Sequence, residues 1–388
     1  MNRIKSFCYW KVYYRILRLC VYLFHFFPVK KNKIVFFNDF GLGYGCNLKY
    51  VCNEILRQQL PYELVWIVKN NSYQMPVGVR KSLISRIQSV YDLSTAKIVI
   101  NNIKGYMNVW KKDSQYFIYI PHGQTGAKKA EKEMNNLNDE YLNASIWHSA
   151  QMDLFITCSC AQSKDMVENF WCTCEILQCG FPRNDIFFKP KEERITQIKR
   201  DLNIPIDKKC LLYAPTFRDN GNDTAYALDM ERLKMSLKKK YQNDWVILVR
   251  LHPNFFWYEE PKFAYSDTIL NVSTYDDIQE LFLISDILIT DYSSTMFDFN
   301  NSHRPVYLFA TDVDEYNKIR GLKDFYFTVP FPLCRNNDEL MHAIEKYNEQ
   351  DYKKKLKAFD MIYGDVDDGH ASERVVERIK AVIKNKFE

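Results

Sequence analysis

Two histidines follow apolar runs, where they could exchange protons with a bound substrate. His122 comes directly after the run 116–121 and before Gly123, with Lys128 and Lys129 close behind. Imidazole is the side chain best suited to accept a proton near neutral pH. A single histidine is more often structural, but this one ends a strand-like run beside a flexible glycine. His122 is therefore the prime candidate for a general base.

The second histidine lies in the run Arg250-Leu251-His252-Pro253. Arg250 and His252 are two residues apart at the end of a predicted strand, so their side chains can point the same way. A guanidinium binds phosphate with two hydrogen bonds, and a histidine can donate to a phosphoryl oxygen or exchange a proton there. The sequence predicts that this pair shares one anionic ligand.

A cluster of hydroxyl side chains follows the apolar run 287–290. The chain continues as Asp291-Tyr292-Ser293-Ser294-Thr295 and then enters a helix-like segment. Serine hydroxyls and unpaired N–H groups at the start of a helix can hold phosphate oxygens. Ordinary capping of the helix by Ser293 or Ser294 would produce the same pattern, and the local sequence leaves both interpretations open.

Other motifs narrow the chemistry further. Thr216 and Arg218 follow the apolar run 210–214 and are additional candidates for anion binding. The acidic runs 312–314 and 365–368 do not form a convincing metal site, and we predict surface turns there. The chain contains no G-x-x-x-x-G-K-S/T, H-E-x-x-H or G-x-S-x-G motif. These absences argue against a P-loop nucleotide hydrolase, a zinc peptidase and a serine hydrolase.

The candidates can act together only if the elements before them end near one another. Strand-length apolar runs alternate with longer helix-like stretches, as in parallel α/β units, and ligands of such sheets bind beyond the carboxyl ends of the strands. The runs are 33–37, 64–68, 97–100, 116–120, 154–158 and 176–178, then 210–214, 245–250, 269–272, 287–290 and 305–309. We predict two Rossmann-like domains, residues 30–188 and 189–388, with a cleft between them.

The composition agrees with a globular chain of this kind. The chain has 388 residues, of which 47% are hydrophobic and 26% charged. Such a composition argues against a disordered, collagen-like or low-complexity protein. The formal net charge of +5 is a mild surplus, and nucleic acid is not predicted as a partner.

Residues 1–29 concentrate part of that positive charge. Their five basic residues interleave with aromatic ones, and the apolar run from Leu19 ends before Pro28. A transmembrane helix needs about 20 apolar residues, so this segment is too short to span a bilayer. We predict an amphipathic helix that lies on an anionic membrane surface, with a core-packing helix as the alternative. No signal-peptide cleavage site follows the run.

The 11 cysteines suggest a reduced chain rather than a disulfide framework. Two pairs, Cys158 with Cys160 and Cys172 with Cys174, have the C-x-C spacing, so zinc binding is one interpretation. Alternation along the strand-like run 154–158 places Cys158 and Cys160 on one face. There a free cysteine behaves as a small hydrophobic residue, and we predict no metal ligands.

Taken in order, the motifs resemble those of the CDP-glycerol glycerophosphotransferase family. They are His122-Gly123, Gly180-Phe181-Pro182-Arg183-Asn184-Asp185, Tyr213-Ala214-Pro215-Thr216-Phe217-Arg218, Arg250-Leu251-His252-Pro253 and Ser285-Asp286-Ile287-Leu288-Ile289-Thr290-Asp291-Tyr292-Ser293-Ser294. Segments 304–314 and 368–374 also resemble that family, so the similarity extends from about residue 33 to residue 374.

The resemblance implies a GT-B-like fold and transfer of glycerol phosphate from CDP-glycerol to an acceptor hydroxyl, with release of CMP. It implies a peripheral enzyme on the cytoplasmic face of the bacterial membrane, in teichoic-acid or capsular polymer synthesis. The implied catalytic residues are His122 and His252. The implied substrate-binding residues are Arg250, Thr216, Arg218, Ser293, Ser294, Thr295, Asp291, Gly123 and Arg183. No tightly bound cofactor is implied, and a dependence on Mg²⁺ stays open.

Several alternatives remain open at this stage. The family commonly has His-Gly-Thr-Pro-Leu-Lys where this chain has His122-Gly123-Gln124-Thr125-Gly126-Ala127-Lys128, so the acceptor, a lipid-linked glycan or a growing polymer, is undecided. The chain also lacks room for the extra helical domain of longer polymerising relatives, so it could prime, extend or decorate a polymer. CDP-ribitol is an alternative donor. A GT-B glycosyltransferase that uses a nucleotide sugar and a non-catalytic membrane scaffold are the alternative functions.

Overall fold

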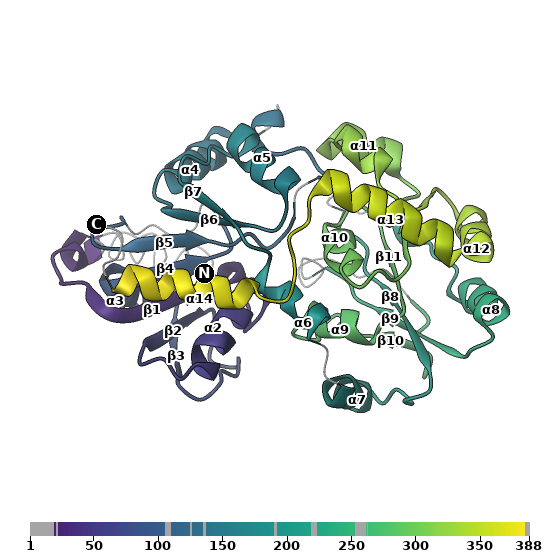
Figure 1. Cartoon of the computed structure of the whole chain (residues 1–388), viewed down its shortest axis with the longest axis horizontal. Coiled ribbons are helices and arrows are strands. Elements are labelled where there is room, and N and C mark those ends of the chain that lie inside the picture. Colours follow the sequence, from purple (N-terminus) through teal and green to yellow (C-terminus); the bar gives the residue numbers. More distant parts are fainter. Residues whose placement is uncertain are drawn as a thin grey trace, which may run out of the picture.

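The computed structural model describes residues 19–20, 22–104, 110–124, 126–134, 137–189, 192–218, 223–252, 261 and 263–384. They form two lobes, each built around one parallel β-sheet (Figure 1). This arrangement confirms the predicted α/β, GT-B-like fold with two Rossmann-like domains. The predicted helix in residues 1–29 lies largely outside the described residues.

The first sheet has seven parallel strands in the order β3-β2-β1-β4-β5-β6-β7. The strands are β1 (Lys30–Phe37), β2 (Glu63–Val68), β3 (Val79–Leu83), β4 (Ala96–Asn101), β5 (Tyr116–Tyr119), β6 (Leu154–Thr157) and β7 (Glu175–Gln178). The central strands are apolar on both faces, as expected of a parallel sheet that helices cover on both sides. Ile34 and Phe36 of β1 face one core, and Val35 and Phe37 face the other.

Helices cover both faces of this sheet. The helices of this domain are α2 (Cys46–Arg57), α3 (Ile87–Thr95), α4 (Asp139–Ser149) and α5 (Cys160–Asn169). The next two, α6 (Asp185–Phe188) and α7 (Glu192–Asp201), pack with a core of the second domain. The apolar side of α2 packs in the core that contains Ile34, whereas α3 packs in the core that contains Val35. Two short 3₁₀ turns, Asp39–Gly41 and Pro182–Asn184, follow β1 and β7.

The second sheet has six parallel strands in the order β10-β9-β8-β11-β12-β13. They are β8 (Lys209–Tyr213), β9 (Trp245–Val249), β10 (Ile269–Asn271), β11 (Ile287–Thr290), β12 (Val306–Phe309) and β13 (Leu333–Cys334). In both sheets the chain starts at a central strand, runs to one edge and then returns to build the other side. The switch point, where ligands of such sheets usually bind, lies between β1 and β4 in the first sheet and between β8 and β11 in the second.

The second sheet is also covered on both faces. Its helices are α8 (Met230–Tyr241), α9 (Ile278–Ile284), α10 (Thr295–Asn300), α11 (Val313–Arg320), α12 (Asn337–Lys346) and α13 (Glu349–Tyr363). Residues of α8 and α12 share one core. Residues of α9, α10 and α13 share the core on the opposite face, which includes the stacked rings of Phe297 and Tyr363, 5.1 Å apart between centroids.

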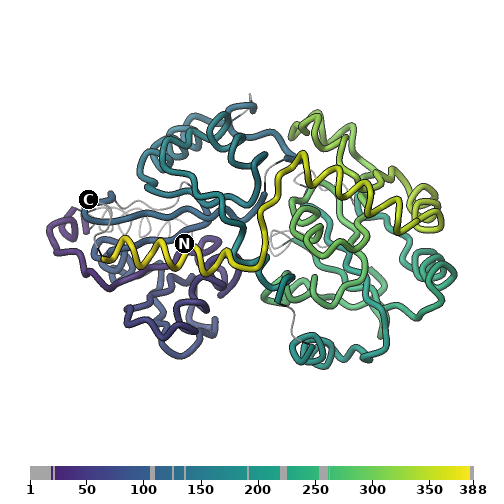
Figure 2. Tube along the Cα trace, viewed as in Figure 1, coloured from purple at the N-terminus to yellow at the C-terminus, as the bar shows by residue number. Residues whose placement is uncertain are grey.

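The last helix, α14 (Ala371–Ile383), returns to the first domain (Figure 2). Val375, Val376 and Ile379 are fully buried in the same core as Ile34 of β1. The predicted second-domain range of residues 189–388 therefore includes a helix that packs on the first sheet. The chain crosses between the domains twice, once after β7 and once after α13.

Candidate active site

The predicted site residues follow four strands whose carboxyl ends face the meeting point of the domains. His122 follows β5, Thr216 follows β8, Arg250 follows β9 and Asp291 follows β11. β8 and β11 are neighbours at the switch point of the second sheet. The parallel topology thus gathers residues that are more than 160 positions apart in the sequence.

Gly123 and Ser294 bring the two domains into direct contact. A Cβ atom built on Gly123 would lie 2.9 Å from the Ser294 hydroxyl oxygen, closer than Cβ atoms come to non-bonded atoms in folded proteins. Glycine is therefore the residue that lets the His122 loop approach the start of α10. Ser294 occupies the N-cap position of α10 without a capping bond from its side chain. Its hydroxyl is directed at the loop that carries His122.

Ser293 and Thr295 have local hydrogen bonds that shape the same turn. The Ser293 hydroxyl accepts from the backbone N–H of Thr295 at 3.4 Å. The Thr295 hydroxyl lies 3.5 Å from the hydroxyl of Thr290, at the end of β11. Both interactions are long, so these hydroxyls are weakly held by the protein and could accept a better partner.

The position of His122 determines which nitrogen of its neutral ring carries the proton. Its Nδ1 atom lies 3.2 Å from the backbone carbonyl oxygen of Asn102. A carbonyl oxygen can only accept a hydrogen bond, so Nδ1 must carry the proton. In the neutral ring, Nε2 then presents a lone pair. The ring is exposed, and a neutral histidine of this tautomer can take a proton from a substrate.

Three side chains hold the backbone on either side of this histidine. The carbonyl oxygen of Pro121 accepts from Asn47 of α2 at 2.9 Å, and that of Gly123 accepts from Gln162 of α5 at 3.4 Å. The carbonyl oxygen of His122 itself accepts from the Arg183 guanidinium. Each consecutive carbonyl from 121 to 123 therefore has a separate partner, and the loop is positioned from three elements.

Arg183 links this loop to the second domain. Its guanidinium pairs with the Asp298 carboxylate of α10 at 2.7 Å, and both side chains are almost fully buried. Burial opposes the charge on Arg183, but the attraction of Asp298 outweighs it and raises the pKa of the guanidinium. Gln124 donates to the same carboxylate at 3.0 Å. Arg183, predicted to bind substrate, is thus engaged by protein groups in this structure.

Arg250 is the predicted cation with the fewest protein partners. Its guanidinium donates to the backbone oxygens of Val272 and Tyr275, at 3.2 and 2.6 Å. In the part of the chain that the structure describes, no carboxylate lies within ion-pair distance of it. Burial lowers the pKa of Arg250, although Asp277 and Asp276 partly oppose that effect. A desolvated cation without a carboxylate partner is well suited to bind an anionic ligand.

His252 lies near several positive groups. Desolvation by the surrounding protein, and then the charges of Lys128, His122 and Arg250, lower the pKa of His252 to about 4. Its imidazole is consequently neutral at physiological pH and can donate one hydrogen bond. The predicted pair, Arg250 and His252, therefore combines a fixed positive charge with a neutral donor.

Three other predicted residues form a buried network instead of an open surface. The Asp291 carboxylate accepts from the N–H of Thr216 at 2.9 Å and from its hydroxyl at 2.5 Å, and it pairs with Arg218 at 2.9 Å. Arg218 also pairs with Asp312 at 2.6 Å. These contacts fix the loop after β8 against the loop after β11.

Two features of the site differ from the sequence prediction or were missed by it. Asp312, predicted to lie in a surface turn, is almost fully buried in its ion pair with Arg218, so that prediction was wrong. Asp314 and Asp368 do lie at the surface, but Asp367 accepts hydrogen bonds from Asn184 and Asn301, so the surface-turn prediction was wrong there too. Asp298 was not predicted as a site residue. A charged residue inside the apolar run Met296-Phe297-Asp298-Phe299 was the signal that could have identified it, since a buried carboxylate needs a partner.

The cysteines and acidic residues of the described part of the chain do not form a metal centre. No group of three or more histidine, cysteine, aspartate or glutamate side chains there could hold an ion. The ten described cysteines are free thiols. Among the described residues, no helix is long and apolar enough to cross a bilayer.

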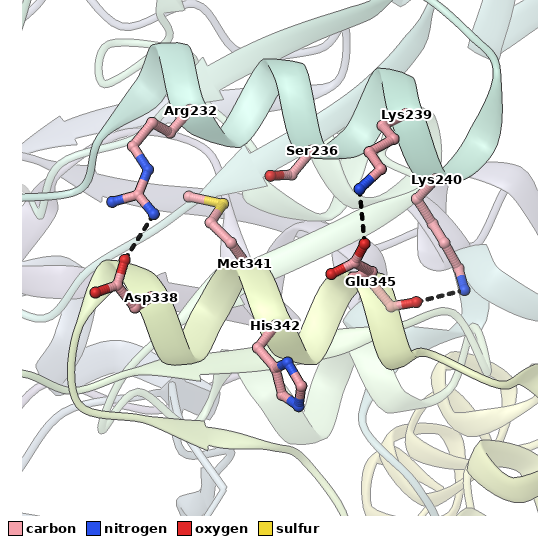
Figure 3. Close-up of a pocket in the computed structure, with 8 residues that line it drawn as sticks. All are labelled: Arg232, Ser236, Lys239, Lys240, Asp338, Met341, His342 and Glu345. Carbon is pink, nitrogen blue, oxygen red and sulfur yellow. Dashed lines mark hydrogen bonds and ion pairs between the residues drawn. The ribbon is translucent and has the colours of Figure 1, made fainter.

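A separate pocket lies between α8 and α12, on the second domain (Figure 3). Its charges largely pair with one another: Arg232 binds Asp338 at 2.6 Å, and Lys239 binds Glu345 at 2.8 Å. The pocket also includes His342, and its lining contains none of the predicted site residues. This pocket is therefore distinct from the candidate site, and its residues are suitable for control variants.

The chain is similar in sequence to one protein family and to several curated proteins. The family model described as CDP-glycerol:poly(glycerophosphate) glycerophosphotransferase matches residues 19–381. The chain is 30% identical over 374 residues to a teichoic acid poly(glycerol phosphate) polymerase of Bacillus subtilis (strain 168), covering 91% of this chain and 49% of that protein. It is also 30% identical over 383 residues to a teichoic acid poly(ribitol-phosphate) polymerase of Bacillus spizizenii, covering 94% and 60%. The chain spans 49% and 60% of the length of these two curated relatives.

Solved structures show a similar overall fold. A structure of the wall teichoic acid polymerase TagF matches with a TM-score of 0.85 and 29% identity, covering 97% of this chain and 96% of that chain. A Staphylococcus aureus MnaA–UDP structure matches with a TM-score of 0.53 and 16% identity, covering 91% and 97%. The second likeness concerns the fold alone.

Proposed function

This chain belongs to the CDP-glycerol:poly(glycerophosphate) glycerophosphotransferase family, and from that premise we propose that it transfers glycerol phosphate from CDP-glycerol to an acceptor hydroxyl and releases CMP. The acceptor is a lipid-linked glycan or a growing polymer of the teichoic-acid or capsular type. The curated relatives that are named as teichoic acid polymerases support this assignment. So does a TagF structure whose title records a soak with CDPG.

The observation that carries the proposal is the contact between the His122 loop and the start of α10. His122 presents Nε2 as a base on the first domain, while Ser294 of the second domain lies against Gly123, the next residue. A donor whose phosphates are held by Ser293, Ser294 and Arg250 would thus lie next to the base. This arrangement suits the attack of an acceptor hydroxyl on phosphorus.

The reaction is a single displacement at the phosphorus that carries glycerol. The acceptor oxygen forms a new bond to that phosphorus, the bond to the bridging oxygen breaks, and CMP leaves. His122 takes the acceptor proton at Nε2. Arg250 and the neutral His252 stabilise the negative charge on the phosphate oxygens, because phosphoryl transfer depends mainly on positioning and electrostatic stabilisation. No covalent enzyme intermediate is needed.

A donor panel tests the proposed reaction. The protein is incubated with a glycan acceptor and, separately, with CDP-glycerol, CDP-ribitol and several nucleotide sugars, and the released nucleotide is identified by chromatography. We expect CMP from CDP-glycerol. CMP from CDP-ribitol alone would move the assignment to ribitol phosphate, which a 30% identical relative is named for. Release from a nucleotide sugar alone would indicate a glycosyltransferase, and donor binding without any turnover would indicate a scaffold. Repeating the assay with a chelator tests the need for Mg²⁺.

We further propose that the segment before β1 brings the enzyme to an anionic membrane surface on the cytoplasmic side. Residues 19–20 and 22–25 are helical. Cys20 and Phe24, one turn apart, pack with the core beneath α3. Leu23 and Phe26 point away from it, and the Phe26 side chain is 86% exposed. Apolar side chains that stay exposed beside a basic sequence are typical of interfacial helices.

Vesicle cosedimentation tests the membrane proposal. We expect the double variant Leu23→Ser/Phe26→Ser to lose vesicle binding and stay folded, because both side chains are exposed. The matched control is Met361→Ser/Ile362→Ser, which removes two exposed apolar side chains from α13. Equal binding of anionic vesicles by both variants and the parent would contradict the proposal.

A further inference from the structure

The chain contains two C-x-C motifs with the same spacing and different geometry. In the first, the Cys158 thiol donates to the Gln162 side-chain oxygen at 3.3 Å, while the Cys160 sulfur accepts from Gln178 at 3.2 Å. In the second, the sulfur atoms of Cys172 and Cys174 lie 3.5 Å from each other. Only the second motif has its two sulfur atoms within hydrogen-bond distance. Spacing alone did not predict this difference.

The backbone around the second motif holds its two sulfur atoms on the same side. The motif occupies the short connection between α5 and β7. Trp171, directly before Cys172, has a φ of +52°, a left-handed conformation that is uncommon for a residue with a side chain. The preceding carbonyl oxygen, of Phe170, accepts from Lys104 at 3.0 Å and from Ser149 at 3.2 Å. The turn is therefore fixed from two other segments of the first domain.

The surroundings favour a reactive sulfur at Cys172. A hydrogen bond from Cys174 is the main factor that lowers the pKa of Cys172 to about 7; burial opposes the effect, and the positive charge of Lys104 supports it. Lys104 is itself buried and paired with Glu131 at 3.0 Å. Cys172 is buried, but Cys174 is only half-buried, so a small reagent can approach the pair from the side of Cys174. A thiolate, not a thiol, is the nucleophile in cysteine oxidation.

We propose that Cys172 and Cys174 form a redox-active dithiol, which a two-electron oxidant such as hydrogen peroxide converts to a disulfide within the loop. The Cys172 sulfur attacks one peroxide oxygen, the O–O bond breaks, and a sulfenic acid and one water result. The Cys174 sulfur then attacks the Cys172 sulfur, which forms the S–S bond and releases a second water. Two thiols are oxidised, and one peroxide is reduced to two waters.

The geometry also predicts that this disulfide is easily reduced. A disulfide between cysteines with only one intervening residue closes a small ring, in which the preferred disulfide geometry is hard to reach. Strained disulfides have higher reduction potentials than structural ones and belong to the labile class. We therefore expect a thiol reductant to reopen it. The proposal is independent of the transfer reaction.

Peroxide treatment of the full-length reduced protein tests the proposal. After treatment, free thiols are alkylated, and intact mass and peptide mapping locate any disulfide. We expect the mass to fall by two hydrogen atoms, with the bond between Cys172 and Cys174, and dithiothreitol to restore both thiols. Because these two sulfur atoms already lie 3.5 Å apart, whereas Cys158 and Cys160 each bond to a different glutamine, closure there should be at least about tenfold faster than at Cys158 and Cys160.

The first C-x-C motif provides the matched control. The variant Cys158→Ser/Cys160→Ser should form the same disulfide at the parent rate, whereas Cys172→Ser and Cys174→Ser should form none. The map of the parent protein locates the bond even if a variant fails to fold. Alkylation of both Cys172 and Cys174 after peroxide treatment of the folded parent would overturn the proposal, as would a bond from either one to a different cysteine.

Discussion

At the scale of single residues, one carbonyl oxygen decides what His122 can do. The Asn102 carbonyl at 3.2 Å requires the proton on Nδ1, so Nε2 is left to act as a base. Asn102 is itself fixed, because its side-chain amide donates to Asn38 at 2.8 Å and to Asp39 at 3.0 Å. The tautomer of the proposed base is thus set by residues that follow β1 and β4, at the switch point of the first sheet.

Replacing His122 tests that role. General-base catalysis typically contributes about 10²- to 10⁴-fold, so we expect His122→Ala to lose turnover on that scale and to bind CDP-glycerol with little change. Single-turnover CMP release and donor titration measure the two effects separately. His342→Ala, which alters a histidine between α8 and α12, is the control and should keep full turnover. A folded His122→Ala variant with near-normal turnover would contradict the role.

Single residues also show the limits of what the sequence could predict. The sequence correctly placed His122 and Gly123 after one strand and Ser294 after another, and the two segments lie against each other. Arg183 and Asp291 follow the same logic, yet both bond to protein groups. A one-dimensional pattern gives the strand end and the residue type, but not whether a charged side chain faces a ligand or a carboxylate from a neighbouring loop. Their substrate contacts stay predictions.

At the scale of elements, the sequence predicted the central strands better than the edges. The apolar runs before His122 and Asp291 appear as β5 and β11, because both are buried on two faces and read as continuous apolar stretches. The edge strand β3, with the sequence VRKSL, has too little apolar character to be recognised, and β13 has only two residues. The apolar residues Val375, Val376, Ile379 and Val382 recur at helical spacing, and this period predicts the helix α14. Its packing on the first sheet is a tertiary contact that periodicity does not encode.

The helix α4 carries a histidine that should make stability depend on pH. His148 is buried, and neither ring nitrogen has a hydrogen-bond partner among the described residues. Desolvation, and then the charge of Lys104, lower its pKa from 6.5 to about 4. Between pH 4 and pH 6.5, His148 therefore binds a proton more readily in the unfolded chain than in the folded protein. The contribution of neutral His148 to the free energy of unfolding is fully present above about pH 6.5 and is lost as the pH falls towards 4.

We expect the free energy of unfolding to fall by up to about 3 kcal/mol through His148 between pH 7 and pH 4. The variant His148→Phe keeps an aromatic ring and cannot titrate, so its stability should fall less over that range. Urea denaturation at several pH values measures the difference between the two proteins. Ile362→Ala, which alters an exposed side chain that does not titrate, is the control and should follow the parent. Parallel pH curves for His148→Phe and the parent would show that this histidine is not the cause.

The packing of α14 predicts that the first domain depends on the end of the described chain. Ile379 is fully buried against the first sheet, and removing such a side chain typically costs about 2 to 5 kcal/mol. We expect Ile379→Ala to lower the free energy of unfolding by that amount. Ile362→Ala, at an exposed position of α13, should change it by less than about 0.5 kcal/mol. Equal stability of the two variants would rule out this packing.

At the scale of the whole molecule, several ion pairs join the domains, among them Lys323 with Asp165, and two others can be compared directly. Arg183 pairs with Asp298 at 2.7 Å, and Lys49 of α2 pairs with Asp277 before α9 at 2.6 Å. Both cations belong to the first domain, and both carboxylates belong to the second. Only the first pair also holds the His122 carbonyl oxygen. The two pairs therefore separate the effect of domain contact from the effect of positioning the base.

This difference predicts different kinetics for two variants. Asp298→Asn keeps an oxygen acceptor but removes the charge, so the His122 loop should lose its position relative to α10. A displacement of about 1 Å can cost about 10²-fold, and we expect a lower kcat with little change in KM for the donor. Lys49→Met should leave kcat near the parent value. Equal losses in the two variants would indicate that domain contact, not positioning, is what Asp298 provides.

The central claim is that the enzyme breaks the bond between the bridging oxygen and the phosphorus that carries glycerol. CDP-glycerol with radioactive phosphorus in the glycerol-side phosphate tests this claim most directly, with separation of the nucleotide from the acceptor product after a single turnover. We predict that the label moves to the acceptor and that one unlabelled CMP is released per transfer. Recovery of the label in CDP, with glycerol joined to the acceptor without phosphate, would contradict the account.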